Sequence, residues 1–566
     1  MGMSIWKIYI FLVVLLTYIS VVNAQDQVVI NSKDWQEVYS GSLYASLKGV
    51  DFHYVVEETQ GLQLYKDVLN RQKKNVLLIQ GKNPVLFGYK KNLEDIGLSV
   101  ETESGDDGRE TSLLLARRAV IELNVTNFII IDDDLGYTSI AVAPYAIITN
   151  STVIYADRNN VDEVTDFLNS VKVDSLLLYG KTDGTIKEAL SAYNPTIIDT
   201  DDKFNDNMRI MERFLRLSPT KQVILTSGDF LEPTFFSNEF PVLLVGSSNL
   251  PDKVVEFLQD QDMKTTIVVG YELGQNAVQI RERTGLRVFL KYGQGRGGQL
   301  YALDIYPIPS HNPKIDIREI RYNTATKQLE VVYENTGAVF TYAQALSHIV
   351  FEQGSSEDNE LGRVGDKEAF FLDAGSVETI TYDLEIVNPA ENMAVNSKVV
   401  LGDSSTALDK LFAKSNMPLI LTNFMDKSEI QLVSATYYPG SKRVDIVVNN
   451  NGATDVYVLL KLVGVVIDGQ KTDIRSEQQI ISPQKTATFK IKLELTDSDL
   501  EINNYLTVNA KYGEKELSMT KELSERLPLV IGKSESIGVL TVVIIVVVVL
   551  GICLKRRVVP LFPGHT

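Results

Sequence analysis

The sequence is poor in cysteine, and this scarcity excludes one common way of stabilising an exported protein. Cys553 is the only cysteine among 566 residues, so no disulfide can form within the chain. The folded protein must therefore depend on its hydrophobic cores, helped by bound cations or by neighbouring molecules in an array.

Histidine is also scarce, and the patterns of common metalloenzymes are missing. The chain has no H-x-x-x-H or C-x-x-C pattern, so the sequence gives zinc chemistry little support. Its four histidines are widely separated in sequence: His53, His311, His348 and His565.

One glycine pattern resembles a dinucleotide-binding fingerprint. Residues 293–298 satisfy G-x-G-x-x-G, but residues 299–306 are predicted to be extended, whereas that fingerprint needs a helix N-terminus. We therefore predict that the protein is not an enzyme and has no resident cofactor, with calcium as the one candidate ion. An envelope hydrolase without a recognisable motif remains an alternative.

Positive charge is in the minority outside the two hydrophobic ends of the chain. Lys and Arg number 55 and Asp and Glu 73. Four of the cations flank or lie within the end segments, which leaves a net charge of about −22 on residues 25–536. Such a field argues against nucleic acid and against docking flat on anionic lipid, because both are negative.

Long hydrophobic runs occur at both ends of the chain. The first contains Lys7 and ends in Val22-Asn23-Ala24, which predicts a signal peptide over residues 1–24. The second, residues 537–554, is uncharged, and as a helix it would span roughly 27 Å. The basic triplet Lys555-Arg556-Arg557 predicts a cytoplasmic tail over residues 555–566. We expect a single-pass cell-membrane protein whose residues 25–536 face outward.

An internal repeat dominates the first half of the outward-facing chain. Val153–Ala156 lies 90 positions before Leu243–Gly246, and Leu178–Gly180 lies 90 positions before Val268–Gly270. Short apolar runs alternate with helical stretches, as in parallel strands covered on both faces. With a degenerate copy near residues 76–82, the pattern predicts three related α/β units in one compact head over residues 25–305.

These repeats resemble the cell wall-binding repeat 2 family. The motifs that carry the resemblance are Thr226–Phe230, Phe240–Val245, Leu250–Leu258 and Ile267–Gly270. The likeness covers residues 45–305, although the family's Asp-Ala-Leu after the loop is missing. The resemblance implies a protein that adheres to the cell envelope, in a family whose repeats sometimes accompany adhesin, enzymatic or surface-layer (S-layer) parts.

A second duplication follows, with an offset of 115 residues. Asn335-Thr336-Gly337 corresponds to Asn450-Asn451-Gly452, and apolar residues alternate before both turns. We predict two antiparallel β-sandwiches, over residues 310–390 and 427–525. Residues 391–426 are predicted to be a linker with a short helix at 404–414, and residues 306–313 an accessible connection to the head.

The two predicted sandwiches resemble the immunoglobulin-like modules of surface-protein stalks, including the CARDB-like adhesion type. With the head, they imply an envelope, S-layer or adhesion protein that binds envelope polymer, glycan or neighbouring surface proteins. The alternative is an extracellular receptor or solute-binding protein that holds a small ligand between α/β units.

Two kinds of candidate site remain. Asp132, Asp133 and Asp134 follow a predicted strand at the sheet edge where α/β folds place ligands, and their oxygens suit calcium. Asp157 and Asp229 follow neighbouring strands and would join the same acidic rim. The alternative is a solvated acidic loop containing a helix N-cap. Two sequons make Asn124 and Asn150 candidate glycosylation sites.

Overall fold

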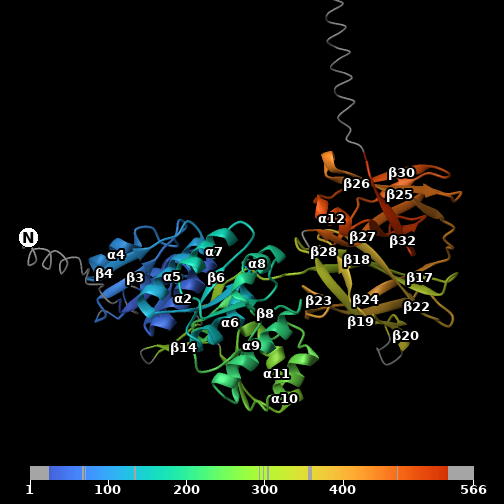
Figure 1. Cartoon of the computed structure of the whole chain (residues 1–566). Coiled ribbons are helices and arrows are strands. Elements are labelled where there is room, and N and C mark those ends of the chain that lie inside the picture. Colours follow the sequence, from blue (N-terminus) through green and yellow to red (C-terminus); the bar gives the residue numbers. More distant parts are fainter. Residues whose placement is uncertain are drawn as a thin grey trace, which may run out of the picture.

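The computed structural model describes residues 25–532, except for 65, 67–68, 71, 133–134, 292, 297–298, 303–304, 355–359 and 468–469. The predicted signal peptide (1–24), membrane helix (537–554) and tail (555–566) lie outside the described residues. Within the described part of the chain, no helix is both long and apolar enough to cross a membrane. Figure 1 shows an α/β head beside two curled β units.

Three four-stranded parallel sheets form the head, and all three have the same strand order. Numbered along the chain within each unit, the strands lie in the order 2-1-3-4. The prediction of repeated α/β units is confirmed at this level. The strands are β1 (Gln27–Ile30), β2 (Asp51–Tyr54), β3 (Asn75–Ile79) and β4 (Ser99–Glu103); β5 (Asn127–Ile131), β6 (Ser151–Tyr155), β7 (Ser175–Tyr179) and β8 (Thr196–Ile198); and β9 (Gln222–Thr226), β11 (Val242–Leu244), β12 (Thr265–Val269) and β13 (Arg287–Lys291).

The repeated sequence segments occupy equivalent places in this topology. The 90-residue offset pairs β6 with β11 and β7 with β12. The predicted amphipathic helices are α7 (Val161–Ser170) and α10 (Asp252–Asp260). The degenerate copy is β3, the third strand of a full unit that begins at Gln27.

The three units share one hydrophobic core and do not form separate beads. The Tyr39 ring, on α2 (Trp35–Lys48), lies 5.4 Å from Phe236 of the third unit and 6.1 Å from Tyr155 of the second. The Tyr54 hydroxyl donates to the Leu231 carbonyl at 3.3 Å. Further helices that pack in the head are α5 (Gly108–Leu123), α6 (Gly136–Ile148), α9 (Lys203–Leu217) and α11 (Gly274–Thr284).

The segment that leaves the head is part of its structure. Strand β16 (Tyr306–Pro307) pairs with β10 (Phe230–Leu231), and the Tyr306 hydroxyl donates to the Ser32 carbonyl at 3.1 Å. Tyr306 and Ile308 are buried. The prediction that residues 306–313 form an accessible connection is therefore wrong for the first half of this segment. Its apolar side chains are buried against the head.

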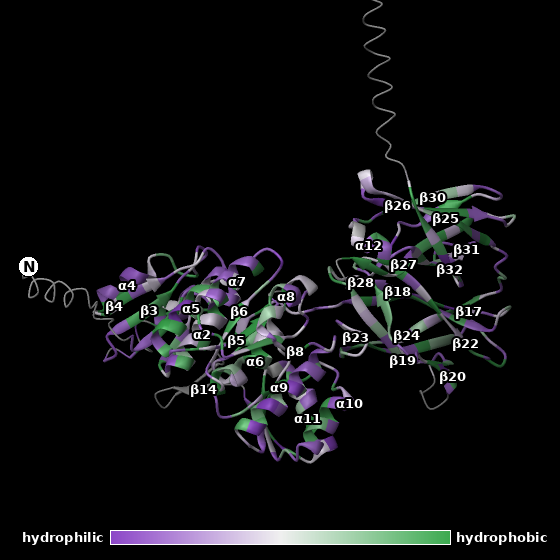
Figure 2. Cartoon of the chain, in the orientation of Figure 1, coloured by the Kyte–Doolittle hydropathy of each residue, from purple (hydrophilic) through white to green (hydrophobic). Residues whose placement is uncertain are grey.

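Each β unit is one eight-stranded, mostly antiparallel sheet that curls around its own core. The prediction of two antiparallel β domains is confirmed in this form, and Figure 2 shows hydrophobic and hydrophilic residues alternating along the strands. The first unit contains β17 (Ile315–Asn323), β18 (Gln328–Asn335), β19 (Thr341–Glu352), β20 (Glu360–Val364), β21 (Phe370–Leu372), β22 (Val377–Asp383), β23 (Met393–Gly402) and β24 (Leu408–Thr422). The second contains β25 (Ile430–Tyr438), β26 (Arg443–Asn450), β27 (Val456–Ile467), β28 (Gln470–Arg475), β29 (Gln479–Ile481), β30 (Thr486–Lys492), β31 (Tyr505–Gly513) and β32 (Lys521–Ile531), with helix α12 (Asp497–Ile502).

The predicted linker over residues 391–426 is wrong, because most of it forms strands β23 and β24 of the first β unit. Strand β24 pairs with β23 along its first part and with β17 at residues 419–422. It thereby joins the two halves of the curled sheet. No helix forms at 404–414; a tight hairpin at 403–407 connects the two strands.

The two β units repeat one buried turn in atomic detail. In the first, Asn335 donates to the Val339 and Leu372 carbonyls and accepts the Gly337 N–H. In the second, Asn450 makes the corresponding bonds, to the Thr454 and Ile481 carbonyls and from the Gly452 N–H. Both asparagines are fully buried. The 115-residue duplication therefore reflects a shared structural requirement.

Candidate functional site

The predicted acidic rim does not assemble as a metal site among the described residues. Asp132 directly follows β5, the first strand of the second sheet, while Asp133 and Asp134 lie outside the described residues. No group of three or more metal-ligating side chains occurs in the described part of the chain. The calcium site at Asp132–Asp134 therefore stays a prediction.

Asp157, expected at the same rim, already has partners. Its carboxylate pairs with Arg109 of the first unit and accepts bonds from Asn159 and from the Asn160 N–H. Burial alone would raise the pKa of Asp157, but these hydrogen bonds and Arg109 hold it below its usual value. Asp157 therefore acts as a structural contact between two units.

The carboxyl ends of the second and third sheets are covered by other parts of the chain. A side chain at Gly228 would collide with Tyr137, and one at Gly136 would collide with Ile308. The Ile308 N–H donates to the Asp229 carbonyl at 3.3 Å. The edge where α/β proteins usually bind ligands therefore serves here for packing between units.

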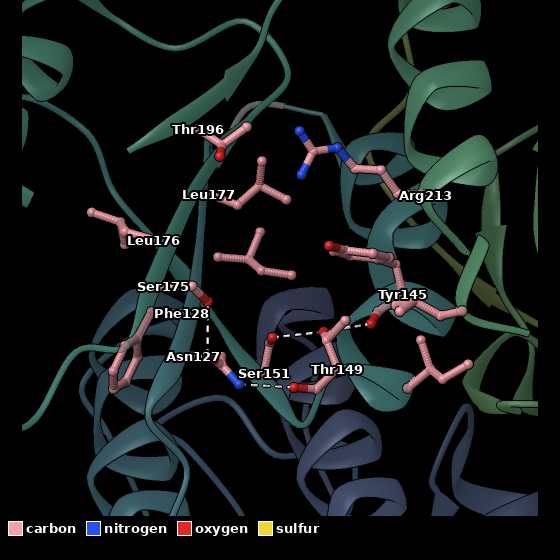
Figure 3. Close-up of a pocket in the computed structure, with 13 residues that line it drawn as sticks. Asn127, Phe128, Tyr145, Thr149, Ser151, Ser175, Leu176, Leu177, Thr196 and Arg213 are labelled. Carbon is pink, nitrogen blue, oxygen red and sulfur yellow. Dashed lines mark hydrogen bonds between the residues drawn. The ribbon is translucent and has the colours of Figure 1, made fainter. Parts of the chain in front are cut away.

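A pocket of about 320 Å³ lies at the opposite edge, beside the second sheet (Figure 3). Strands β5, β7 and β8 form one wall, and helices α6 and α9 form the other. Apolar side chains make the floor and polar ones the rim. The lining residues are Asn127, Phe128, Ile129, Tyr145, Ile148, Thr149, Ser151, Ser175, Leu176, Leu177, Thr196, Arg213 and Leu217.

Hydrogen bonds fix the polar rim of this pocket. The Asn127 amide donates to the Thr149 carbonyl at 3.0 Å and its oxygen accepts from the Ser175 hydroxyl at 2.7 Å. The Thr149 hydroxyl lies 2.7 Å from both the Ser151 hydroxyl and the Tyr145 carbonyl. The rim is therefore held in place without a ligand.

The only charged side chain in the lining is Arg213, and Figure 3 shows it reaching over the pocket from α9. Within the described part of the chain it has no hydrogen bond or ion pair. Its neighbours Met211 and Phe214 are buried in the core beneath the helix. Arg213 therefore lies at the margin of this core. Sequence reasoning missed this pocket, because its walls come from strands and helices that are spread along residues 127–217 and match no motif.

Both candidate glycosylation sites lie at the same edge as the pocket. Asn124 and Asn150 are exposed and adopt left-handed backbone conformations, with φ of 55° and 49°. Asn124 lies three residues before β5, and Asn150 directly precedes the adjacent strand β6. Asn150 is therefore next to Ser151 of the rim. The structure thus brings the two sequons together, while their modification stays a prediction.

A buried lysine joins the head to the first β unit, which the sequence analysis did not foresee. The Lys203 ammonium lies 2.8 Å from Asp409 and 3.2 Å from Asp403, and all three side chains are at most a tenth exposed. Ala407, at the hairpin tip, belongs to the hydrophobic core of the head. The Ser248 and Asn249 N–H groups donate to the Asp409 carbonyl.

The surroundings of this ion cluster are also buried and titratable. Burial raises the pKa of Tyr137, and the negative charge of Asp403 raises it further. Burial lowers the pKa of His311. None of these groups lines the pocket beside the second sheet.

No protein-family model matches the sequence, and no curated protein matches it. Among solved structures, Cwp6 from Clostridium difficile is similar at 15% identity and a TM-score of 0.35, over 47% of this chain and 54% of that one. Cwp8 from the same organism is similar at 14% identity and a TM-score of 0.39, over 46% of this chain and 48% of that one. A red sea bream transglutaminase scores only 0.13, at 13% identity, over 47% of this chain and 34% of that one.

These likenesses carry no functional argument at such scores. The matched region spans about half the length of the two Clostridium proteins. Membership of the cell wall-binding repeat 2 family and the CARDB-like character of the β units remain predictions.

Proposed function

We propose that this chain is a membrane-anchored cell-surface protein of the envelope, S-layer or adhesion type. Its α/β head engages envelope polymer, glycan or neighbouring copies, and the two β units act as a stalk. The observation that supports this proposal is that the head contacts the first β unit, and the second β unit is stacked on the first (Figure 1).

Strand β24 supplies the first of these contacts. Its start at Leu408 is docked on the head, where Asn249 donates to the Leu408 carbonyl at 2.7 Å. Its 15 residues cover roughly 50 Å at the usual strand rise. Just beyond its end, the Phe424 carbonyl accepts a bond from Asn323 at the boundary with the second unit.

The boundary between the β units is tied by charged side chains. Glu330 of the first unit forms an ion pair with Arg321 at 3.1 Å and accepts a hydrogen bond from the Ser518 hydroxyl of the second unit at 2.8 Å. Glu378 lies 2.9 Å from Arg475 across the same boundary. Because these carboxylates are buried and paired, the contact favours one fixed orientation of the two units.

The last strand carries the chain away from this boundary. Lys521, at the start of β32, donates to the Ser428 carbonyl at 2.7 Å. Ile531, at its end, lies at the far end of the second unit, close in sequence to the hydrophobic run at 537–554. This geometry would display the head at a distance from the membrane.

The anchoring can be tested with the full-length chain in cells that export it. Val546→Arg with Val547→Arg places two charges in the predicted span, at a cost of about 2.5–3.5 kcal/mol each, and should release the protein into the medium. Val559→Arg, in the tail, should leave it in the membrane fraction. External protease should digest residues 25–532 on intact cells; full protection, or retention of the double variant, would reject the topology.

The receptor or solute-binding alternative is favoured by one observation, the preformed pocket beside the second sheet. The two functions differ in assembly. Electron microscopy of the full chain in membranes should show lateral arrays for an S-layer protein and isolated molecules for a receptor.

A further inference from the structure

We propose that the pocket beside the second sheet binds a carboxylated sugar residue, such as a hexuronate. This inference rests on the proposed function insofar as it assumes that the head faces envelope glycan. It assigns the ligand-binding role to a specific place, the cleft between β5, β7, α6 and α9.

The charge of the pocket indicates an anionic ligand. The whole chain has 73 acidic residues against 55 basic ones, yet the lining contains Arg213 and no Asp or Glu. The guanidinium is planar and can donate two parallel hydrogen bonds to a carboxylate. Because Arg213 has no partner within the described part of the chain, a bound anion would not have to displace one.

The remaining lining fits a sugar ring. Hydroxyl groups of Thr149, Ser151, Ser175 and Thr196 are presented around the rim, and hydroxyls both donate and accept hydrogen bonds. Leu177 and the aromatic ring of Tyr145 offer apolar surface to the C–H face of a sugar. A volume of about 320 Å³ is at the lower end for small-molecule sites and suits a short saccharide.

The position of the pocket suits access by a polymer. It opens at the amino ends of the strands, whereas the carboxyl ends of the second and third sheets are covered by Tyr137 and Ile308. Because hydrogen bonds already hold the side chains of the rim in place, few of them have to be ordered when a ligand binds.

The test uses full-length protein purified in detergent and titration calorimetry. Digalacturonate is the probe, and the uncharged galactose dimer and galactose 6-phosphate are the comparison ligands. We expect digalacturonate to bind, the neutral dimer to bind at least about tenfold more weakly, and the phosphate to be a poorer ligand than the carboxylate.

Arg213→Gln should weaken digalacturonate binding about tenfold or more, because it removes the charged donor. Arg216→Gln is the matched control, because Arg216 lies on the same helix, is exposed and does not line the pocket. This variant should bind digalacturonate with the affinity of the parent protein. Both variants should keep the parent melting temperature, which separates loss of binding from loss of folding.

Three outcomes would overturn the proposal: no binding of digalacturonate, equal binding of the neutral dimer, or equal weakening by both arginine variants. Equal or tighter binding of galactose 6-phosphate would show a general anion site and overturn the carboxylate assignment. None of these outcomes bears on release of the chain by charges in residues 537–554, so this inference and the membrane anchoring can fail separately.

Discussion

The Lys203 ammonium lies 2.8 Å from the Asp409 carboxylate, although the two residues are 206 positions apart. Lys203 begins the helix that also carries Arg213, and Asp409 is the second residue of β24. The contact therefore couples the helix that lines the pocket to β24, the longest strand of the first β unit.

Removing this lysine should destabilise the protein strongly. Lys203→Met leaves two buried carboxylates without a counterion, and we expect a loss of about 3–5 kcal/mol in the free energy of unfolding. Denaturant titration of the full chain measures the loss. Limited proteolysis should also cut the 403–407 hairpin sooner.

Lys73→Met provides the matched control. Its ion pair with Asp51 is largely exposed, so its loss should be below about 1 kcal/mol. Comparable losses in the two variants would contradict a stabilising role for the buried joint.

The buried asparagine of the second β unit should be sensitive to substitution. Asn450→Ala removes three hydrogen bonds and leaves two carbonyls short of a donor, so we expect a loss of about 3 kcal/mol. Asn451→Ala, at the exposed neighbouring position, should change stability by less than about 0.5 kcal/mol. Equal effects in chemical denaturation would show that the turn does not depend on the Asn450 amide.

His348 should make the first β unit sensitive to acid. It is fully buried between the Tyr333 and Ser397 hydroxyls, at 2.7 and 2.8 Å, and burial lowers its pKa to about 4. In the unfolded chain the imidazole takes up a proton near pH 6.5, whereas in the folded protein it does so only near pH 4. The free energy of unfolding therefore falls as the pH drops from 6.5 to 4, by about 3 kcal/mol at most.

The measurement is unfolding free energy against pH for the parent and for His348→Gln. The variant should lose this part of the pH dependence, whereas His53→Gln should keep it. An unchanged slope between pH 6.5 and 4 in His348→Gln would contradict the assignment.

The two sequons should be modified together in a host that glycosylates exported proteins. Asn124 and Asn150 are exposed at one edge, so peptide mass spectrometry should find glycan on both. Asn194 is an internal control: it is exposed with a similar φ of 48°, but proline follows it and blocks the sequon. Glycan at Asn194, or none at the two sequons, would contradict this prediction.

Repetition made much of the fold predictable. Segments such as Leu177–Gly180 and Ile267–Gly270 both have three apolar or aromatic residues followed by glycine, because each must form a strand buried on both faces. The Asn-x-Gly turns kept their sequence because one buried amide satisfies three backbone groups. Local chemistry of this kind is visible in a single sequence.

Long-range packing accounts for what the sequence did not reveal. The hairpin before Leu408 has a polar tip and half-exposed strands, which resembles a linker until Ala407 is seen inside the head core. Similarly, Arg213 becomes notable only because folding sets it across from Thr196 and Ser175. No spacing along the chain encodes either relationship.

Strand β24 has a mechanical consequence. It is continuous from Leu408 at the head to Thr422 near the second β unit, and it pairs with β23 on the way. Tension between the head and the C-terminal end would act along the strand axis, so that many backbone hydrogen bonds would have to yield at once in shear. The first β unit would then serve as a stiff load-bearing element between the head and the second β unit.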